Sequence, residues 1–272
     1  MSKVIKYLVK VSAFITFGIL LSIIGYILMR GIPYLKPSLF ALNYTSENVS
    51  LFPAIITTLI IMVLALLVYA PIGIFTGFHL VEYAKSDNKL VHLVRLTAET
   101  LAGIPSIVYG LFGLLFFVTT LEWGFSIIAG AFTLAIMMLP LIIRSTEEAL
   151  LAVPNPLREA SFGLGAGKLR TIFRIVLPSA MPGILAGIIL SIGRIVGETA
   201  ALIYTAGTVP KVPENLFASG RTLAIHMDAL SSEGLYKDQA YATAVVLLIL
   251  IMGINGLSTS ISKRITKGNI DG

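Results

Sequence analysis

The 272-residue sequence contains no cysteine and few charged residues. Without cysteine, the chain has no disulfide framework and no thiolate metal site. Only 12% of its residues are charged, whereas a soluble domain has about 25%, and its mean hydropathy is +0.92. The three histidines, His79, His92 and His226, are far apart in sequence and form no metal-ligand pattern. We therefore expect an integral membrane protein without a metal site.

Ten-residue segments of alternating hydrophobicity are also missing, which favours a helical bundle over a barrel. Six apolar stretches have about the 20 residues that a helix needs to cross the hydrocarbon. They run roughly over residues 11–30, 53–77, 96–120, 125–143, 180–206 and 240–262. The sequence therefore predicts an all-α integral membrane protein with six transmembrane helices.

Lysine and arginine are unevenly distributed around these stretches. If the N-terminus lies inside, fourteen of them fall in inner segments and five in outer segments, and only Arg194 lies within a span. Positive charge is enriched in cytoplasmic loops, so both termini are expected in the cytoplasm. The net charge of +6 is thus a signal of topology, and membrane lipid rather than nucleic acid is the expected surrounding.

Composition divides the chain into three parts. Residues 1–52 hold the first helix and an outer loop, residues 53–262 hold a transmembrane core, and residues 263–272 form a basic cytoplasmic tail. The core contains a polar inner loop at about 149–178.

Prolines predict interruptions within the core. Pro71 predicts a kink or break near the inner end of the second span. Pro105 has two interpretations: it begins the third transmembrane helix, with residues 89–102 along the inner interface, or it kinks one long helix. The residues alone do not decide between these.

The inner loop begins with a strong helix signal. In Asn155-Pro156 the asparagine suits the N-cap and the proline suits the first helical position. The three glycines between 163 and 167 are expected to end this helix within about two turns. A second short helix is expected from Lys168 to Leu177. Two prolines, at 178 and 182, are expected to break it from the fifth span.

This loop also carries a spaced motif. It reads Glu159-Ala160-Ser161, three residues, Gly165, nine residues, and Ile175-x-Leu177-Pro178. The pattern resembles the Glu-Ala-Ala signature of the permease subunits of bacterial ABC importers, and only Ser161 departs from it. The resemblance implies the type I importer permease fold and a cytoplasmic ATPase dimer as partner. It implies that the ATPase is coupled through Glu159, Ala160, Gly165, Ile175, Leu177 and Pro178. The alternative interpretation is an ordinary amphipathic connector.

The glycines of the same loop superficially suggest a phosphate-binding loop. A P-loop needs Gly-x4-Gly-Lys-Ser/Thr, but position 162 is Phe and position 169 is Leu. We therefore expect no ATPase site, no enzymatic activity and no cofactor in this chain. ATP and magnesium belong on the partner ATPase.

Arg194 lies near the middle of the fifth apolar stretch. If hydrocarbon begins near Gly183, Arg194 is about 16 Å deep, where a charged side chain is costly. Glu198 follows four residues later, so the two side chains would share a helix face and pair. Gly193 and Gly197 form a small-xxx-small step beside them. One interpretation is a structural ion pair; the other is that the remaining guanidinium donors serve a substrate.

The motif Gly-Arg-x-x-Gly-Glu-Thr around Arg194 resembles that of the PstA permeases of bacterial phosphate-specific importers. The sister PstC subunits share much of this motif. The stretches 80–84 and 104–113 resemble the same family. The resemblance implies that Arg194 and Glu198 line a phosphate path. It also implies a heterodimer with a homologous permease, an extracytoplasmic phosphate-binding protein, and a place in the bacterial cytoplasmic membrane.

Two alternatives to a phosphate importer remain at this point. One is an ABC permease for another oxyanion, such as sulfate or molybdate. The other is a secondary transporter that uses Arg194 and Glu198 as an ion relay. Ser106 and Tyr109 are weaker candidates for an anion path, because hydroxyls beside glycine are more often used in packing. Asn255, in the sixth span, is interpreted as an interhelical hydrogen bond.

Overall fold

The computed structural model describes residues 3–84 and 88–268, and every regular element in them is helical. The long helices are α1 (Lys3–Gly31), α2 (Phe52–Phe78), α5 (Ile127–Leu151), α8 (Leu177–Val196) and α11 (Lys237–Gly268). The shorter ones are α3 (Lys89–Ala102), α4 (Ser106–Gly113), α6 (Asn155–Gly163), α7 (Lys168–Thr171), α9 (Ala200–Ile203) and α10 (Leu223–Glu233). Two 3₁₀ turns follow α1, η1 (Ile32–Tyr34) and η2 (Pro37–Phe40). Three π-helical turns extend or precede longer helices: η3 (His79–Tyr83), η4 (Leu114–Thr120) and η5 (Ile172–Val176).

Five helical segments are long and apolar enough to cross a membrane, which accounts for five of the six predicted spans. The remaining one, residues 96–120, is a bent pair. Helix α3 and the segment formed by α4 and η4 meet at 103°. Pro105 is the N-cap residue of α4, so it begins a new helix and does not kink a long one. This settles that choice in favour of a new helix at Pro105.

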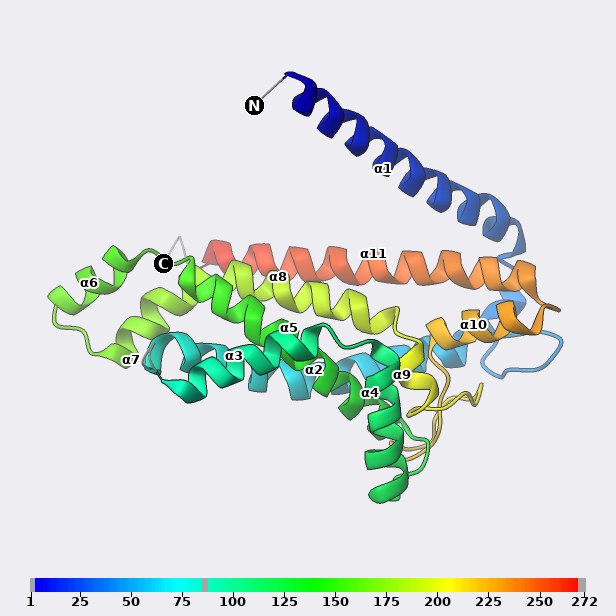
Figure 1. Cartoon of the computed structure of the whole chain (residues 1–272). Coiled ribbons are helices and arrows are strands. Elements are labelled where there is room, and N and C mark those ends of the chain that lie inside the picture. The colour runs from blue at the N-terminus through cyan, green and yellow to red at the C-terminus, as the bar shows by residue number, and fades with distance from the viewer. Residues whose placement is uncertain (1–2, 85–87, 269–272) are drawn as a thin grey trace.

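Figure 1 shows how the segments alternate between the two ends of the bundle. Helix α6, the end of α2, and the C-terminal end of α11 gather at one end, and α1 begins toward that same end. Helix α10 and the connections around it occupy the opposite end. The loops that were predicted to share one side of the membrane therefore share one end of the molecule.

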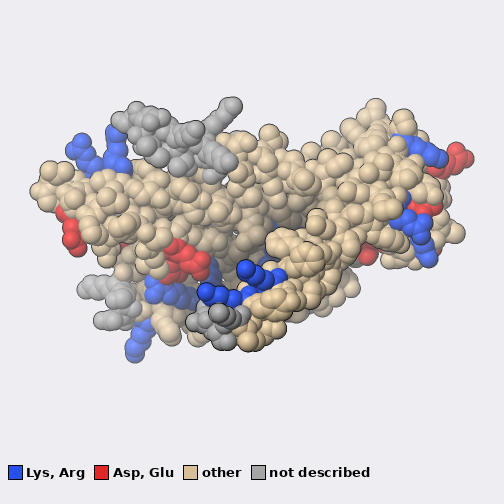
Figure 2. Space-filling model, turned by 90° about the horizontal axis from the view of Figure 1, so that it is seen from above, with Lys and Arg blue, Asp and Glu red and all other residues tan. Residues whose placement is uncertain are grey.

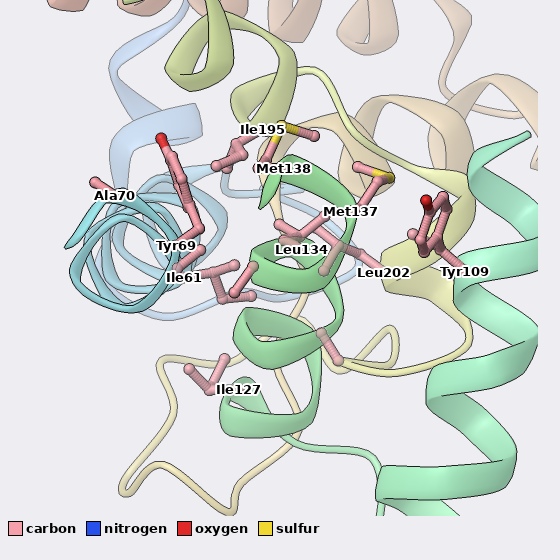
Figure 3. Packing of buried hydrophobic residues seen from close by; sticks show 14 of the residues in the cluster. Ile61, Tyr69, Ala70, Tyr109, Ile127, Leu134, Met137, Met138, Ile195 and Leu202 are labelled. Carbon is pink, nitrogen blue, oxygen red and sulfur yellow. The ribbon is translucent and has the colours of Figure 1, made fainter. Parts of the chain in front are cut away.

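The core lies where α2 and α5 pack together most extensively, with α8 against α5. In Figure 3, Ile61 of α2 is directed toward α5, and Leu134 and Met138 of α5 belong to the same buried cluster. Glycine permits this close approach, because a Cβ at Gly73 would overlap the side chain of Ile142. The buried apolar cluster therefore holds α5 at the centre of the bundle.

A buried hydrogen bond joins two of these helices. The hydroxyls of Tyr69 on α2 and Ser191 on α8 lie 2.6 Å apart, and both residues are fully buried. Ser191 also donates to the carbonyl of Ile188. A buried hydroxyl without a partner would be costly, so the pair fixes the register of α8 against α2.

Helix α1 lies apart from this core in Figure 1 and meets it only near its C-terminal end. There a Cβ at Gly31 would overlap the carbonyl of Tyr241 on α11. None of the most apolar window of α1 is buried within the chain. Figure 2 likewise shows wide uncharged stretches on the face that is in view. This apolar surface fits a helix surrounded by lipid or by another membrane subunit.

The structure corrects two sequence-based predictions about proline. Helix α2 runs through Pro71, so the break that was one of the two expectations there is wrong. The chain is also helical without interruption from Lys168 to Val196, so neither Pro178 nor Pro182 separates the second loop helix from the fifth span. Pro178 comes two residues after the π-turn η5, where the regular i→i−4 hydrogen bonds of the α-helix are already interrupted.

Candidate functional site

The polar loop forms a compact unit of two short helices at one end of the bundle. Helix α6 has nine residues, and Gly165 follows it with φ of +82°, a left-handed conformation that favours glycine. The predicted short helix ended by glycine is therefore confirmed. The helix begins one residue earlier than predicted, because the N-cap residue is Pro154 and not Asn155, which is already helical. The Asn155 side chain makes no capping bond and accepts instead from Arg158.

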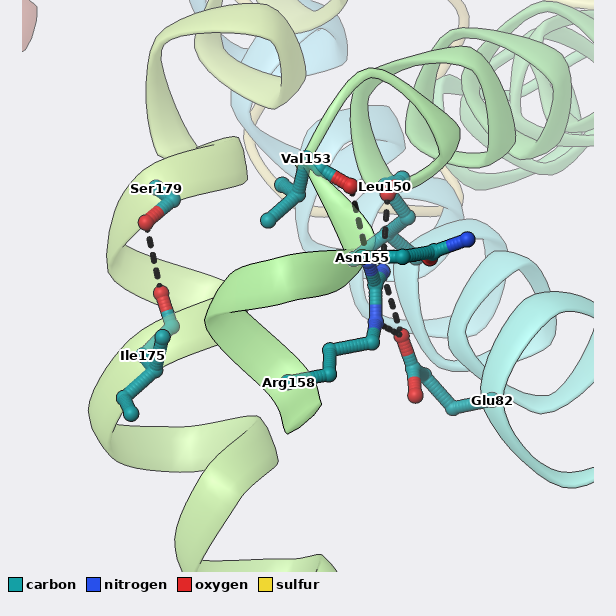
Figure 4. Close-up of polar contacts among 7 residues, drawn as sticks. All are labelled: Glu82, Leu150, Val153, Asn155, Arg158, Ile175 and Ser179. Atoms are coloured by element: carbon teal, nitrogen blue, oxygen red, sulfur yellow. Dashed lines mark hydrogen bonds and ion pairs between the residues drawn. The ribbon is translucent and has the colours of Figure 1, made fainter. Parts of the chain in front are cut away.

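Arg158 clamps α6 to the ends of two spanning helices (Figure 4). Its Nη2 lies 2.8 Å from Oε1 of Glu82, in the π-turn that extends α2. It also donates to two carbonyls at the C-terminal end of α5, that of Leu150 at 3.0 Å and that of Val153 at 2.7 Å. The Arg158 and Glu82 side chains are only 15% and 10% exposed. The last carbonyls of a helix lack partners within it, so this guanidinium caps α5 while it holds α6.

Two further contacts stabilise the loop. The hydroxyls of Ser161 on α6 and Thr171 on α7 lie 2.8 Å apart, and both residues are buried. Lys168 places its Nζ 4.7 Å from the centre of the Tyr83 ring. Ser161 is the one position that departs from the Glu-Ala-Ala signature, and its hydroxyl supplies a bond that alanine lacks.

The six predicted coupling residues divide into two groups in the structure. Glu159, Ala160 and Gly165 are exposed. Ile175, Leu177 and Pro178 are half-buried at the junction of η5 and α8. Leu177 packs on a buried cluster that includes Leu150 and Val153 of the α5 end. The loop therefore exposes one face and anchors the other to the transmembrane helices.

The predicted ion pair between Arg194 and Glu198 is absent from the described structure. Helix α8 ends at Val196, so Glu198 lies beyond the helix and does not share a face with Arg194. Glu198 is buried, and its Oε1 accepts a hydrogen bond of 3.2 Å from the backbone N–H of Ala201. The prediction of pairing was wrong because the four-residue rule requires an unbroken helix.

Arg194 instead lies free in a groove. It occupies the last turn of α8, where the helix dipole stabilises a cation. The groove has a volume of about 820 Å³ and runs between α8 and α11. None of the described residues that line it is Asp or Glu. Within the described residues the guanidinium has no hydrogen bond or ion pair, so its donors are available to a ligand.

The weaker candidates occupy different settings. Tyr109 is buried in α4, and its hydroxyl donates to the carbonyl of Leu101 at 2.9 Å, across the bend from α3. Ser106 is half-buried at the start of α4. The structure therefore gives the Tyr109 hydroxyl a structural partner.

Asn255 departs from its predicted role. It lines the same groove as Arg194, but its side chain makes no hydrogen bond to another helix within the described residues. Its Oδ1 is buried without a partner. Sequence reasoning also overlooked the clamp of Arg158 and Glu82, since no local pattern links residues that lie 76 positions apart.

Residues 70–267 match the family described as the binding-protein-dependent transport system inner membrane component. The chain belongs to this family. Members are transport subunits, and the ATPase activity resides in a partner subunit. Membership confirms the predicted ABC importer permease and inner-membrane location. It also excludes a secondary transporter with an Arg194–Glu198 relay.

Relatives and solved structures agree with this family. The chain is 34% identical over 271 residues to the probable ABC transporter permease protein YqgI of Bacillus subtilis, covering 92% of each. It is 36% identical over 207 residues to the phosphate transport system permease protein PstA of Mycobacterium leprae, covering 75% of this chain and 67% of that one. In fold it resembles a subunit of a bacterial alginate ABC transporter in complex with a periplasmic protein. The TM-score is 0.72 at 18% identity, with 97% of this chain and 95% of that chain covered. The MetNI methionine ABC transporter gives 0.59 at 20% identity, over 79% and 94%. These structures carry the importer permease fold.

Proposed function

We propose that this chain forms part of the membrane path of an ATP-driven importer of inorganic phosphate. The observation that carries the proposal is the unpaired guanidinium of Arg194 in a groove that no described carboxylate lines. A cation without a counter-ion at the depth of a spanning helix is costly unless it serves a ligand. The relatives named PstA support phosphate as that ligand.

Glu198 has a supporting role in the proposed path. Its carboxylate is engaged by the backbone of α9, so it leaves the guanidinium free for an anion. Tyr109 is a weaker candidate for the path, because its buried hydroxyl already donates to the carbonyl of Leu101. Ser106 is the first residue of α4 and is likewise a weaker candidate for contact with the anion.

The polar loop supplies the connection to ATP hydrolysis. Its exposed face, with Glu159 and Gly165, is proposed to dock on one subunit of a cytoplasmic ATPase dimer. A push on this face would be transmitted by Arg158 to Glu82 and to the end of α5, because the guanidinium bridges all three elements. The path would then alternate in access as α2 and α5 move.

The substrate is tested by stimulation of ATP hydrolysis. The complex of this chain with its partner permease, ATPase and binding protein is reconstituted in lipid vesicles. ATP hydrolysis is measured with binding protein loaded with phosphate, sulfate or molybdate. The proposal predicts stimulation by the phosphate-loaded form alone. Stimulation by sulfate or molybdate, with none by phosphate, would assign the permease to another oxyanion.

A second permease subunit is the other part of the proposal. One guanidinium carries a single positive charge, whereas phosphate near neutral pH carries between one and two negative charges. A homologous subunit around a twofold axis would bring a second cation to the path. Vesicles that contain this chain and the ATPase without the second permease should therefore not take up phosphate. Uptake by such vesicles would refute the heterodimer.

A further inference from the structure

Helix α11, the last of the five long helices, contributes an amide to the groove that holds Arg194. Asn255 on α11 lines this groove together with Arg194 on α8. Both residues line the groove, and the site where Gly193, the chain neighbour of Arg194, would carry a Cβ lies 3.9 Å from Asn255 Nδ2 and 4.0 Å from its Oδ1. The amide therefore lies against α8 at the turn that carries Arg194.

The amide has no structural task among the described residues. Its Oδ1 is buried and unpartnered, and no hydrogen bond joins the side chain to another helix. A polar group in a spanning helix costs free energy unless it is paired or functional. Leucine or isoleucine would fill the same place in α11 without that cost. Hydrogen bonding among the described residues therefore does not account for this amide.

The direction of the amide specifies what it can bind. Asn255 lines the groove, and its Oδ1 is buried without a partner, whereas Nδ2, the hydrogen-bond donor of the amide, is not among the buried unpartnered atoms of the described residues. The guanidinium of Arg194 contributes further donors. A third polar residue, Thr259, has its hydroxyl already bonded to the backbone carbonyl of Asn255 at 2.7 Å. Two free donor groups without a carboxylate suit an oxyanion.

We propose that Asn255 is a substrate-binding residue that donates a hydrogen bond from Nδ2 to the oxyanion held by Arg194. This inference rests on the proposed function and adds α11 to the transport path. Arginine supplies charge and attracts any anion, whereas a neutral amide contributes directional hydrogen bonding. Asn255 therefore helps to orient a tetrahedral anion beside the guanidinium.

The test uses the complete reconstituted complex and three variants of this chain. Asn255→Leu removes the donor and suits an apolar helix, so the complex should assemble normally. Its phosphate uptake per ATP hydrolysed should fall about tenfold, which corresponds to about 1.4 kcal/mol. Asn255→Asp places a carboxylate beside Arg194 and should reduce uptake further. Thr259→Val is the matched control in the same groove, and its uptake should stay within about twofold of the original.

The outcomes separate this inference from the proposed function. Normal uptake per ATP in Asn255→Leu, in a complex that transports phosphate, would overturn the inference and leave the proposed function intact. If the unaltered complex transports sulfate and not phosphate, the proposed substrate is wrong, and the same variants measured with sulfate decide the role of Asn255. A complex that transports no oxyanion would overturn both. Failure of Asn255→Leu to assemble, with Asn255→Asp assembling and transporting normally, would assign the residue to the fold.

Discussion

The clamp between Arg158 and Glu82 gives the sharpest prediction about stability. Arg158→Gln removes the guanidinium that joins α6 to the Glu82 carboxylate and to two carbonyls of the α5 end. The Glu82 side chain is only 10% exposed, so it is left as a nearly buried charge without a partner. Breaking one side of a buried ion pair costs about 3–5 kcal/mol.

The cost should be local to α6, which has few other anchors. Taking about 3 kcal/mol as the lower figure, the opening of α6 becomes more than about a hundredfold more frequent. Hydrogen exchange of the α6 amides in the assembled complex measures this directly. Exchange in the middle of α5, near Leu134, should not change, because that segment is packed in the core.

An exposed pair on the same protein provides the matched control. Arg144 and Glu148 lie 2.9 Å apart on α5, but both side chains are more than half exposed. Such pairs contribute about 0.3–0.5 kcal/mol, so Arg144→Gln should change exchange by less than about threefold. If Arg158→Gln and Arg144→Gln changed hydrogen exchange of the α6 amides equally, the reasoning would be refuted. Burial of the ion pair and its bridging contacts would then not stabilise α6 beyond an exposed pair.

Three further predictions concern the loop, the path and the outer end. Gly165→Val forces a branched side chain into a left-handed conformation and should abolish co-purification of the ATPase. Gly163→Ala is the control, because Gly163 has an ordinary helical conformation with open space around it, and this variant should keep the ATPase. Co-purification of the ATPase with both variants would argue against the docking face. Arg194→Gln should assemble with unchanged thermal stability yet lose phosphate uptake, because Glu198 is not its partner; loss of assembly would return Arg194 to a structural role. Burial, and next the charge of Arg221, lower the pKa of His226 on α10 to about 4. Between about pH 6.5 and 4, His226 is therefore neutral in the native state but takes up a proton in the unfolded chain. The stability that this difference contributes is fully present above about pH 6.5 and is lost as the pH falls toward 4, by up to about 3 kcal/mol. Hydrogen exchange of α10 against pH should show this loss, and the same slope in His226→Gln would contradict it.

The parts of the fold that depend on local pattern were predictable from sequence. Apolar length placed the long helices, and the glycines after α6 correctly ended a short helix. The spaced motif around Glu159 identified the importer permease family, because its residues lie within 20 positions of one another. These features follow from rules that act over a few turns of chain.

The features that sequence could not give depend on contacts between distant segments. Helix α8 ends at Val196, where the chain turns into α9. The four-residue spacing of Arg194 and Glu198 therefore predicted an ion pair that the described structure does not contain. Glu82, the carboxylate partner of Arg158, lies 76 positions away, and no pattern around either residue predicts the contact. Asn255 was interpreted as a link between helices, and only the packed groove shows that its amide has no such partner.

The division of the chain into a helix with its outer loop, a core and a tail remains a prediction. The family match begins at residue 70, inside the predicted core, and ends at residue 267, within the predicted tail. The side on which the termini lie also remains a prediction, although their helices point to the same end of the bundle.

Accumulation of radiolabelled phosphate in vesicles tests the central claim most directly. The complete complex is reconstituted so that ATP is enclosed on the side of the polar loop and loaded binding protein is added on the other side. The account predicts ATP-dependent accumulation against a gradient, and its loss in Arg194→Gln while ATP hydrolysis stimulated by the binding protein continues at least in part. Accumulation that proceeds without ATP, or that is undiminished in Arg194→Gln, would contradict it.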